Sequence, residues 1–386
     1  FVLRCEVSAL RDKSTSISDT NFVQSLMDSD GIVNEQVLTV DIEALEMLNV
    51  QAQDIEDFTG LEDFEALKVF ICGGNMVQGT LDLTSNVLLE ELYASFSEVQ
   101  DVDLTNCTSL RILEIHDNEL TNLDVSNNLV LEEVYLGNEA EDIPPYNEFV
   151  TLDFSANPRL RILDSYFVFT LTDVNLDGTT DLQVAEFEAC GLTSIDVSTN
   201  FMLERLRLGL IDMNFTGVSN DLTSVDVSNN PNLISLGVEN TDISSLDLRN
   251  GANDILIGMN ALQTPNLSCI LVDDETAATN GDVPYGSWPL DAGTQFSETE
   301  CTIGVEDYLL DTVNVFPNPV VDVLTIQNSE QLVLDTITVY DILGKKMMTL
   351  TDTLSGSLDM TLLPSGVYFV RMELGDAVLT KKVLKK

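Results

Sequence analysis

The sequence predicts a mostly β protein. We expect a solenoid of stacked parallel strands with a helical cap at its N-terminal end, followed by a small antiparallel β-sandwich. Three observations predict this fold. An aspartate-containing hexapeptide recurs at a nearly constant spacing through the middle of the chain. Apolar residues alternate with a period of two around it, as in short strands with one buried face. Composition and charge change near residue 304.

The recurring hexapeptide predicts the solenoid. LDLTSN at 81–86, LDVSNN at 123–128 and IDVSTN at 195–200 are three of its copies. Successive spacings are 21, 21, 29, 22, 21, 30 and 21 residues when Asn175 fills one slot. The other slots hold Asp82, Asp103, Asp124, Asp153, Asp196, Asp226 and Asp247. A fixed period of this size indicates stacked repeats, each of which buries its apolar face against its neighbours.

A second pattern lies about ten residues from each copy. LRILEIHDNEL at 110–120 reads L-x-x-L-x-L-x-x-N-x-L, and related segments occur in the other repeats. They begin at Leu45, Leu67, Leu89, Leu131, Leu160, Leu182, Leu203 and Leu233. Residues 40–273 thus resemble the leucine-rich repeat, in its 21-residue nested subclass. The resemblance implies parallel strands on two sides of a solenoid spanning residues 45–273.

The ends of such a solenoid need caps, because the end repeats lack a neighbour on one side. Residues 1–44 supply the first cap, in which Phe22, Val23, Leu26 and Met27 have helical spacing. Residues 274–303 form the second. Cys269 and Cys301 bracket this non-repeating segment, and we expect a disulfide between them in an oxidising exterior. Cys72, Cys107 and Cys190 occupy inward slots of the repeats and are expected to be buried free thiols.

Residues 304–386 contain short β-rich runs separated by turn signals, which predict a small sandwich. This tail closely resembles the type A C-terminal sorting domain of the type IX secretion system of Bacteroidetes-type bacteria. The resemblance rests on Pro317, Asn318, Pro319, Gly344, Lys345, Gly366, Tyr368, Lys381, Lys382, Lys385 and Lys386. It implies export by the type IX machinery to the outer-membrane surface or the medium of a Gram-negative bacterium. Alternatively, the terminal lysines only protect an exposed sheet edge from pairing.

Charge limits the range of partners. The formal net charge is -48, and residues 1–304 hold 54 acidic and 10 basic side chains. Such a field repels nucleic acids and anionic membranes, so we expect neither as a partner. No apolar run approaches the length of a transmembrane helix.

Cofactor signals are weak. DVNLDG at 173–178 imitates a calcium loop with Asp173, Asn175 and Asp177, but the twelfth position is Val184 where a bidentate glutamate is needed. We favour an ordinary repeat variant over a calcium site, and we expect no cofactor. The aspartates of the hexapeptides could bind divalent cations diffusely, but the favoured interpretation is that each accepts hydrogen bonds within its own turn.

No familiar catalytic motif is present. The single histidine, His116, is expected to be a solvent-facing strand residue. A glycosidase-like carboxylate pair could be hidden among the 65 acidic residues. A secreted carbohydrate-active enzyme and a purely structural surface-coat protein therefore stay open as alternatives to a non-enzymatic recognition or adhesion protein.

Outward positions of the L-x-x-L-x-L strands suggest a binding surface for an extracellular protein or glycan. The candidates are Tyr93, Glu114, Tyr135, Tyr166, Phe167, Glu186, Glu188, Arg205 and Arg207. Insertions within 139–149 and 209–221 should emerge along one edge and flank a ligand that lies across residues 131–208. The competing interpretation of the tyrosines is the ordinary preference of aromatic residues for strands.

Overall fold

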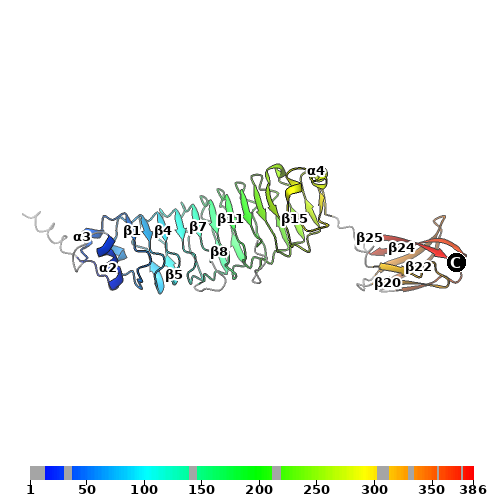
Figure 1. The fold of residues 1–386 in the computed structure, drawn as a ribbon, viewed down its shortest axis with the longest axis horizontal. Helices are drawn as coiled ribbons and strands as arrows, with labels where there is room; N and C mark the ends of the chain where they lie inside the picture. Colours follow the sequence, from blue (N-terminus) through cyan, green and yellow to red (C-terminus); the bar gives the residue numbers. More distant parts are fainter. Residues whose placement is uncertain are drawn as a thin grey trace, which may run out of the picture. The chain divides into compact units, whose positions relative to one another are not determined.

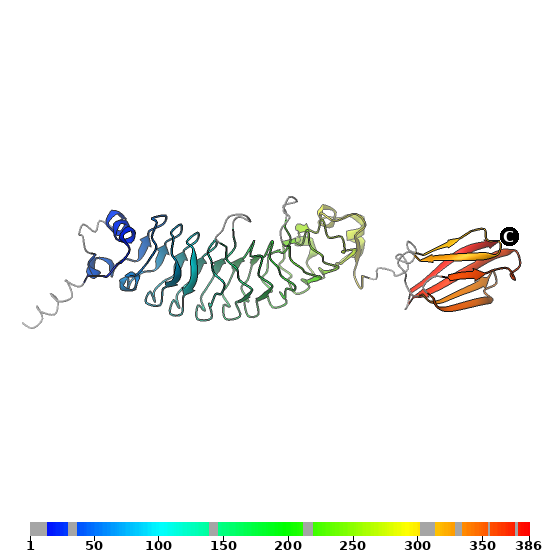
Figure 2. The ribbon, with the colours of Figure 1, turned by 90° about the horizontal axis from the view of Figure 1, so that it is seen from below.

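The computed structural model describes residues 14–29, 37–138, 146–210, 219–301, 313–328, 334–353, 356–374 and 377–386. The chain divides between Thr299 and Glu300 into two compact units. The first unit is the solenoid with its caps, and the second is a small β domain (Figures 1 and 2). The observed fold confirms the predicted class of a parallel-strand solenoid followed by antiparallel sheets.

One side of the solenoid is a ten-stranded parallel sheet, here called the main sheet. Its strands are three residues long, and their middle side chains are buried while the flanking ones face outward. In spatial order they are β1 (Met47–Asn49), β2 (Val69–Ile71), β4 (Glu91–Tyr93), β6 (Ile112–Glu114), β7 (Glu133–Tyr135), β9 (Ile162–Asp164), β11 (Val184–Glu186), β12 (Arg205–Arg207), β14 (Ser235–Gly237) and β16 (Gly258–Asn260).

The opposite side carries shorter parallel sheets formed by the hexapeptide copies. The pairs are β3 (Gly79–Asp82) with β5 (Val99–Asp103), and β8 (Thr151–Asp153) with β10 (Asp173–Asn175). A further sheet orders β13 (Ser224–Asp226), β15 (Ser245–Asp247), β17 (Cys269–Leu271) and β18 (Gln295–Ser297). The last strand lies in the segment predicted as a cap, so the second sheet continues beyond the recognisable repeats.

Buried asparagines hold consecutive coils together on the side of the hexapeptides. Asn86, Asn128, Asn157, Asn200 and Asn230 are at most 1% exposed. Each amide nitrogen donates to two main-chain carbonyls of the preceding coil at 2.8–3.3 Å. Each of these carbonyls also accepts a main-chain hydrogen bond within its own coil, so the asparagine amide supplies a second donor that links the two coils. We call this series the asparagine ladder.

The caps cover the two ends of the repeat core. At the N-terminal end, helix α2 (Thr20–Ser29) buries Phe22 and Leu26 completely, as its helical pattern predicts. Phe22 contacts Phe58 edge to face, with ring centroids 5.2 Å apart. Helix α3 (Thr39–Ile42) lies between α2 and the first strand, and the 3-10 turn η1 (Leu61–Asp63) follows β1 within the first repeat.

At the other end, Trp288 donates its indole N–H to the carbonyl of Leu256 at 2.8 Å. Its ring also contacts Tyr285, with centroids 4.7 Å apart. The helical elements of this end are η2 (Asn253–Ile255), α4 (Glu275–Asn280) and η3 (Tyr285–Ser287). Aromatic packing therefore closes the core where the repeat pattern stops.

The second unit packs two antiparallel sheets around their own core of buried residues, which include Ile337 and Val370. One sheet contains β19 (Val313–Phe316), β20 (Val323–Asn328) and β23 (Gly356–Asp359). The other orders β22 (Lys346–Thr353), β21 (Leu334–Asp341), β24 (Gly366–Leu374) and β25 (Ala377–Lys385). Strand β25 is therefore an edge strand.

Candidate functional site

The outer face of the main sheet brings most of the predicted binding residues together. The third residues of six successive strands pair directly across the sheet and form one row. This central row runs Tyr93, Glu114, Tyr135, Asp164, Glu186 and Arg207. Parallel strands lie about 4.8 Å apart, so neighbouring side chains in the row contact one another. Arg205 lies in the other outward row, opposite Val184 and Ser235.

A second row follows two residues further along the chain, just beyond the strands. It contains Ser95, His116, Gly137, Tyr166 and Glu188, whose carbonyls accept main-chain hydrogen bonds from the preceding coils. We call it the turn row. The residues after it include Phe96, Asp117 and Phe167, which have positive φ of 57°, 52° and 58°. The left-handed backbone ends each strand sharply, and it is uncommon for residues other than glycine.

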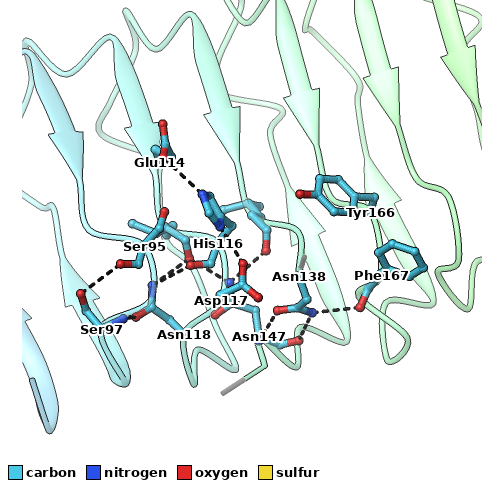
Figure 3. Close-up of polar contacts among 12 residues, drawn as sticks. Ser95, Ser97, Glu114, His116, Asp117, Asn118, Asn138, Asn147, Tyr166 and Phe167 are labelled. Carbon is cyan, nitrogen blue, oxygen red and sulfur yellow. Dashed lines mark hydrogen bonds and ion pairs between the residues drawn. The ribbon is translucent and has the colours of Figure 1, made fainter. Parts of the chain in front are cut away.

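His116 is held between two carboxylates of this surface (Figure 3). Its Nδ1 lies 2.7 Å from Asp117 Oδ2, and its Nε2 lies 3.2 Å from Glu114 Oε1. Burial alone would lower the pKa of His116, but hydrogen bonds to Asp117 and Glu114 outweigh it and raise the pKa to about 9. The ring is therefore an imidazolium at neutral pH that donates to both partners.

The expectation of a solvent-facing strand histidine was wrong. Only 16% of the His116 side chain is exposed, and the residue lies beyond the end of β6. Its edge packs against the ring of Phe96, with centroids 5.0 Å apart. The positions of Glu114 and Asp117 around the only histidine were the available signal, but the turn that directs all three side chains to one place is not visible in a strand pattern.

Two shallow hollows lie on either side of His116. One, of about 240 Å³, is lined by Gln51, Ile71, Gly73, Tyr93, Ser95, Phe96, Glu114 and His116. The other, of about 200 Å³, is lined by Glu114, His116, Tyr135, Gly137, Asp164 and Tyr166. Of the nine predicted binding residues, Tyr93, Glu114, Tyr135 and Tyr166 thus line hollows. The hollow beside Tyr93 is called the first hollow, and the hollow beside Tyr135 and Tyr166 is called the second hollow.

The phenols of the central row are tied to neighbouring acids. Tyr93 Oη donates to Glu91 at 3.0 Å, and Tyr135 Oη donates to Glu133 at 3.1 Å. Burial and these acids raise the pKa of each phenol to about 12. Both phenols therefore stay protonated, with their rings available for contact beside the hollows.

Carboxylates further along the face are partly shielded from water. Burial raises the pKa of Asp164 to about 7, and the nearby Glu186 adds to the effect. Burial likewise raises the pKa of Glu188 to about 7, again with a contribution from Glu186. Asp164 is not among the binding residues predicted from the sequence, because its partial burial depends on the neighbouring coils.

The remaining predicted residues form ion pairs and an aromatic contact. Arg205 Nη1 lies 3.3 Å from Glu186 Oε1, and Arg207 Nη1 lies 4.0 Å from the buried Glu239. The rings of Tyr166 and Phe167 meet edge to face, with centroids 5.6 Å apart. The arginines therefore partly neutralise Glu186 of β11 and Glu239, which follows β14, toward the C-terminal part of the face.

Two insertions are predicted to flank the candidate surface. Residues 139–145 and 211–218 lie outside the described part of the chain, so a ligand position between those two loops stays a prediction. The surface from Tyr93 to Arg207 is described without them.

The hexapeptide aspartates accept hydrogen bonds from their own turns. The Oδ1 atoms of Asp82, Asp103, Asp124, Asp153, Asp196, Asp226 and Asp247 accept from the main-chain N–H two residues later at 2.8–3.1 Å. Asn175 does the same for Asp177 at 3.0 Å, and Asp173 begins β10. Within the described residues, no group of three or more His, Cys, Asp and Glu side chains could hold a metal ion.

The cysteines follow the repeat. Cys72, Cys107 and Cys190 are buried free thiols. Cys107 occupies an asparagine slot and donates its thiol to the carbonyl of Leu83 at 3.3 Å. Cys269 and Cys301 are both disulfide-bonded, as the predicted bond between them requires.

The motifs of the tail meet at one edge of its sandwich. The amide nitrogen of Asn318 donates to the carbonyl of Lys382, and its Oδ1 accepts from the main chain of Leu384, both at 2.9 Å. Asn318, between Pro317 and Pro319, thereby covers part of the free edge of β25, which carries Lys381, Lys382 and Lys385 next to the terminal Lys386.

The other motif residues shape the turns of this unit. Gly344 has φ of 78° in the turn before Lys345. Gly366 begins β24 opposite Lys385, and Tyr368 Oη donates to the carbonyl of Pro364 at 2.8 Å.

Comparison with known proteins identifies the tail. Residues 314–386 match the family described as the secretion system C-terminal sorting domain. This tail implies handling by the type IX secretion system and export to the cell surface or the medium. No helix in the described parts of the chain is long and apolar enough to cross a membrane. No curated protein matches the chain.

One of the solved structures similar to this one supports the fold. The functional domain of InlJ from Listeria monocytogenes, described as including a cysteine ladder, matches with a TM-score of 0.50 and 20% identity over 97% of this chain and 98% of that chain. The Listeria monocytogenes internalin-like protein lmo2027 matches with a TM-score of 0.39 and 14% identity over 95% and 96%. InlP from the same organism gives 0.39 and 15% over the same shares.

Proposed function

We propose that this secreted surface protein is a non-enzymatic recognition or adhesion protein that binds an extracellular protein or glycan through the outer face of the main sheet. One observation carries the proposal. The central row and the turn row place tyrosines, carboxylates and the His116 imidazolium side by side around two adjoining hollows. Aromatic rings with hydrogen-bonding groups on a rigid face are typical of recognition surfaces.

The rigidity of the face supports binding further. Each strand of the central row forms main-chain hydrogen bonds with both neighbouring coils, and the middle side chain of each strand is buried in the core. A preformed surface loses little conformational entropy when a ligand binds. The export tail places this surface where extracellular ligands are found.

A screen of the purified full-length chain on glycan and protein arrays tests the proposal. We expect at least one ligand class to bind saturably, and mass spectrometry should recover that ligand chemically unchanged. Failure of every ligand class to bind would contradict the proposal. Conversion of a bound ligand into a product would instead identify an enzyme.

A further inference from the structure

The second hollow has a glycine, Gly137, next to the ring of Tyr166. Gly137 lies on its floor between His116 and Tyr166 in the turn row. A Cβ atom on Gly137 would lie 2.7 Å from the carbonyl oxygen of Tyr166 and 2.9 Å from Cδ1 of its ring. Only glycine therefore allows Tyr166 to lie against this floor, with Tyr135 as the other aromatic residue in the lining.

Negative charge in this hollow exceeds the positive charge that faces it. Glu114 and Asp164 line this hollow beside one imidazolium, that of His116, which already bonds Glu114 and the neighbouring Asp117. Among the residues that the structure describes, Asp164 Oδ1 accepts one main-chain hydrogen bond, from Tyr166 at 3.2 Å. No lysine or arginine forms an ion pair with Asp164 or Glu114 in the described part of the chain. The inserted segment 139–145 contains no basic residue.

The adjoining first hollow contains an unsatisfied hydroxyl. Ser95 is 6% exposed, and its Oγ is buried without a hydrogen-bond partner among the described residues. Ser95 lines this hollow together with Glu114 and His116, and its hydroxyl lies on the same side of the turn as those two residues (Figure 3). Most buried hydroxyls have a partner, so the unpaired Ser95 Oγ is a hydrogen-bonding group beside this hollow that a ligand can use.

Resting on the proposed function, we propose that the second hollow takes the ammonium or guanidinium end of a lysine or arginine side chain from a basic segment of a partner protein. That cation would lie between Glu114 and Asp164 against the rings of Tyr135 and Tyr166. A cation over an aromatic face is attracted by the ring quadrupole, and the attraction grows when water is excluded.

The charge of the whole molecule favours this ligand over a neutral glycan. A formal net charge of -48 attracts basic surfaces from a distance and speeds their association. A cation that reaches the partly buried Asp164 favours the ionised form of this side chain, and the charge-assisted hydrogen bond formed there is stronger than in water. The unpaired Ser95 hydroxyl accepts a main-chain or side-chain N–H from the next part of the same segment.

Calorimetric titration of the full-length chain with an acetylated, amidated tetralysine peptide tests the inference. We expect Asp164→Asn to weaken peptide binding by about tenfold or more, since it removes a shielded, hydrogen-bonded charge. Asp181→Asn is the matched control, because Asp181 is an exposed turn acid of the neighbouring coil. It should change the affinity less than about twofold. Circular dichroism must show that both variants fold like the parent.

Two outcomes would overturn the inference. Equal losses in Asp164→Asn and Asp181→Asn would mean that the peptide binds the diffuse charge of the surface. Binding of a neutral oligosaccharide that Asp164→Asn abolishes, without binding of tetralysine, would assign the hollow to a glycan. In that second case the proposed recognition function would stand, whereas an array screen with no ligand at all would remove it.

Discussion

Replacing one member of the asparagine ladder should destabilise the solenoid by a calculable amount. Asn128 is fully buried, and its amide donates to the carbonyls of Leu104 at 3.3 Å and Cys107 at 2.8 Å. Asn128→Ala removes both donors and leaves a small cavity between two coils. Both carbonyls belong to the preceding coil, so the loss acts on the contact between neighbouring repeats.

The expected cost is about 2 kcal/mol. A buried carbonyl that loses its donor costs about 1–3 kcal/mol. Each of the two carbonyls is assigned the lower value of about 1 kcal/mol, because each also accepts a main-chain hydrogen bond. Leu104 accepts it from Cys107, and Cys107 accepts it from Leu110. The cavity adds about 1 kcal/mol. Asn128 Oδ1 is buried without a partner in the described structure, so removing this oxygen stabilises the folded variant by about 1 kcal/mol.

Urea titration followed by far-ultraviolet circular dichroism measures this effect. The control is Asn127→Ala, because Asn127 is the exposed neighbour in the same turn. We expect the control to lie within about 0.5 kcal/mol of the parent in free energy of unfolding. If Asn128→Ala were equally neutral, the ladder would not stabilise the stack of coils, and the reasoning would be refuted.

Three further outcomes follow from the structure. The pKa of Asp164 is raised to about 7 by burial, so the folded state favours its protonated form, and its contribution to the free energy of unfolding should fall as pH rises from about 4 to 7. Asp164→Asn should make that fall smaller, and an unchanged pH dependence would contradict it. Replacing Cys269 and Cys301 together by serine should cost about 3–4 kcal/mol in the chain-entropy model for a loop of about 30 residues. Non-reducing peptide mapping of the parent that found both thiols free would contradict the bond. Deleting residues 305–386 should leave a folded solenoid in the periplasm, since its contacts are local, and surface labelling of the truncated chain in its native host would contradict a sorting role.

The sequence predicts the solenoid well because its contacts repeat with the chain. Each coil bonds the next at a separation of one repeat, so a period in the residues becomes a period in space. The interpretation of the hexapeptide aspartates as turn acceptors holds for the same reason, because Asp103 and Thr105 are only two residues apart. Cys107 replaces an asparagine of the ladder without breaking this geometry.

The chemistry of the outer face is less visible in the sequence. The partial burial of Asp164 and His116 depends on three coils and on the left-handed turn at Asp117, none of which a strand pattern specifies. The bonds from Asn318 to the last strand connect residues 64 and 66 positions apart, so no local motif predicts them. Such features arise from packing between segments that are distant in the chain.

The most direct test of the recognition surface is the affinity of the full-length chain for an array-selected ligand, before and after Tyr135, Tyr166 and Phe167 are changed together to alanine. Phe201→Ala is the control, because Phe201 is an aromatic residue on a turn away from this face and is 53% exposed. We expect the triple variant to bind at least about tenfold more weakly, with an unchanged circular dichroism spectrum, while the control binds like the parent. Unchanged affinity in a folded triple variant would place the binding site elsewhere on the molecule.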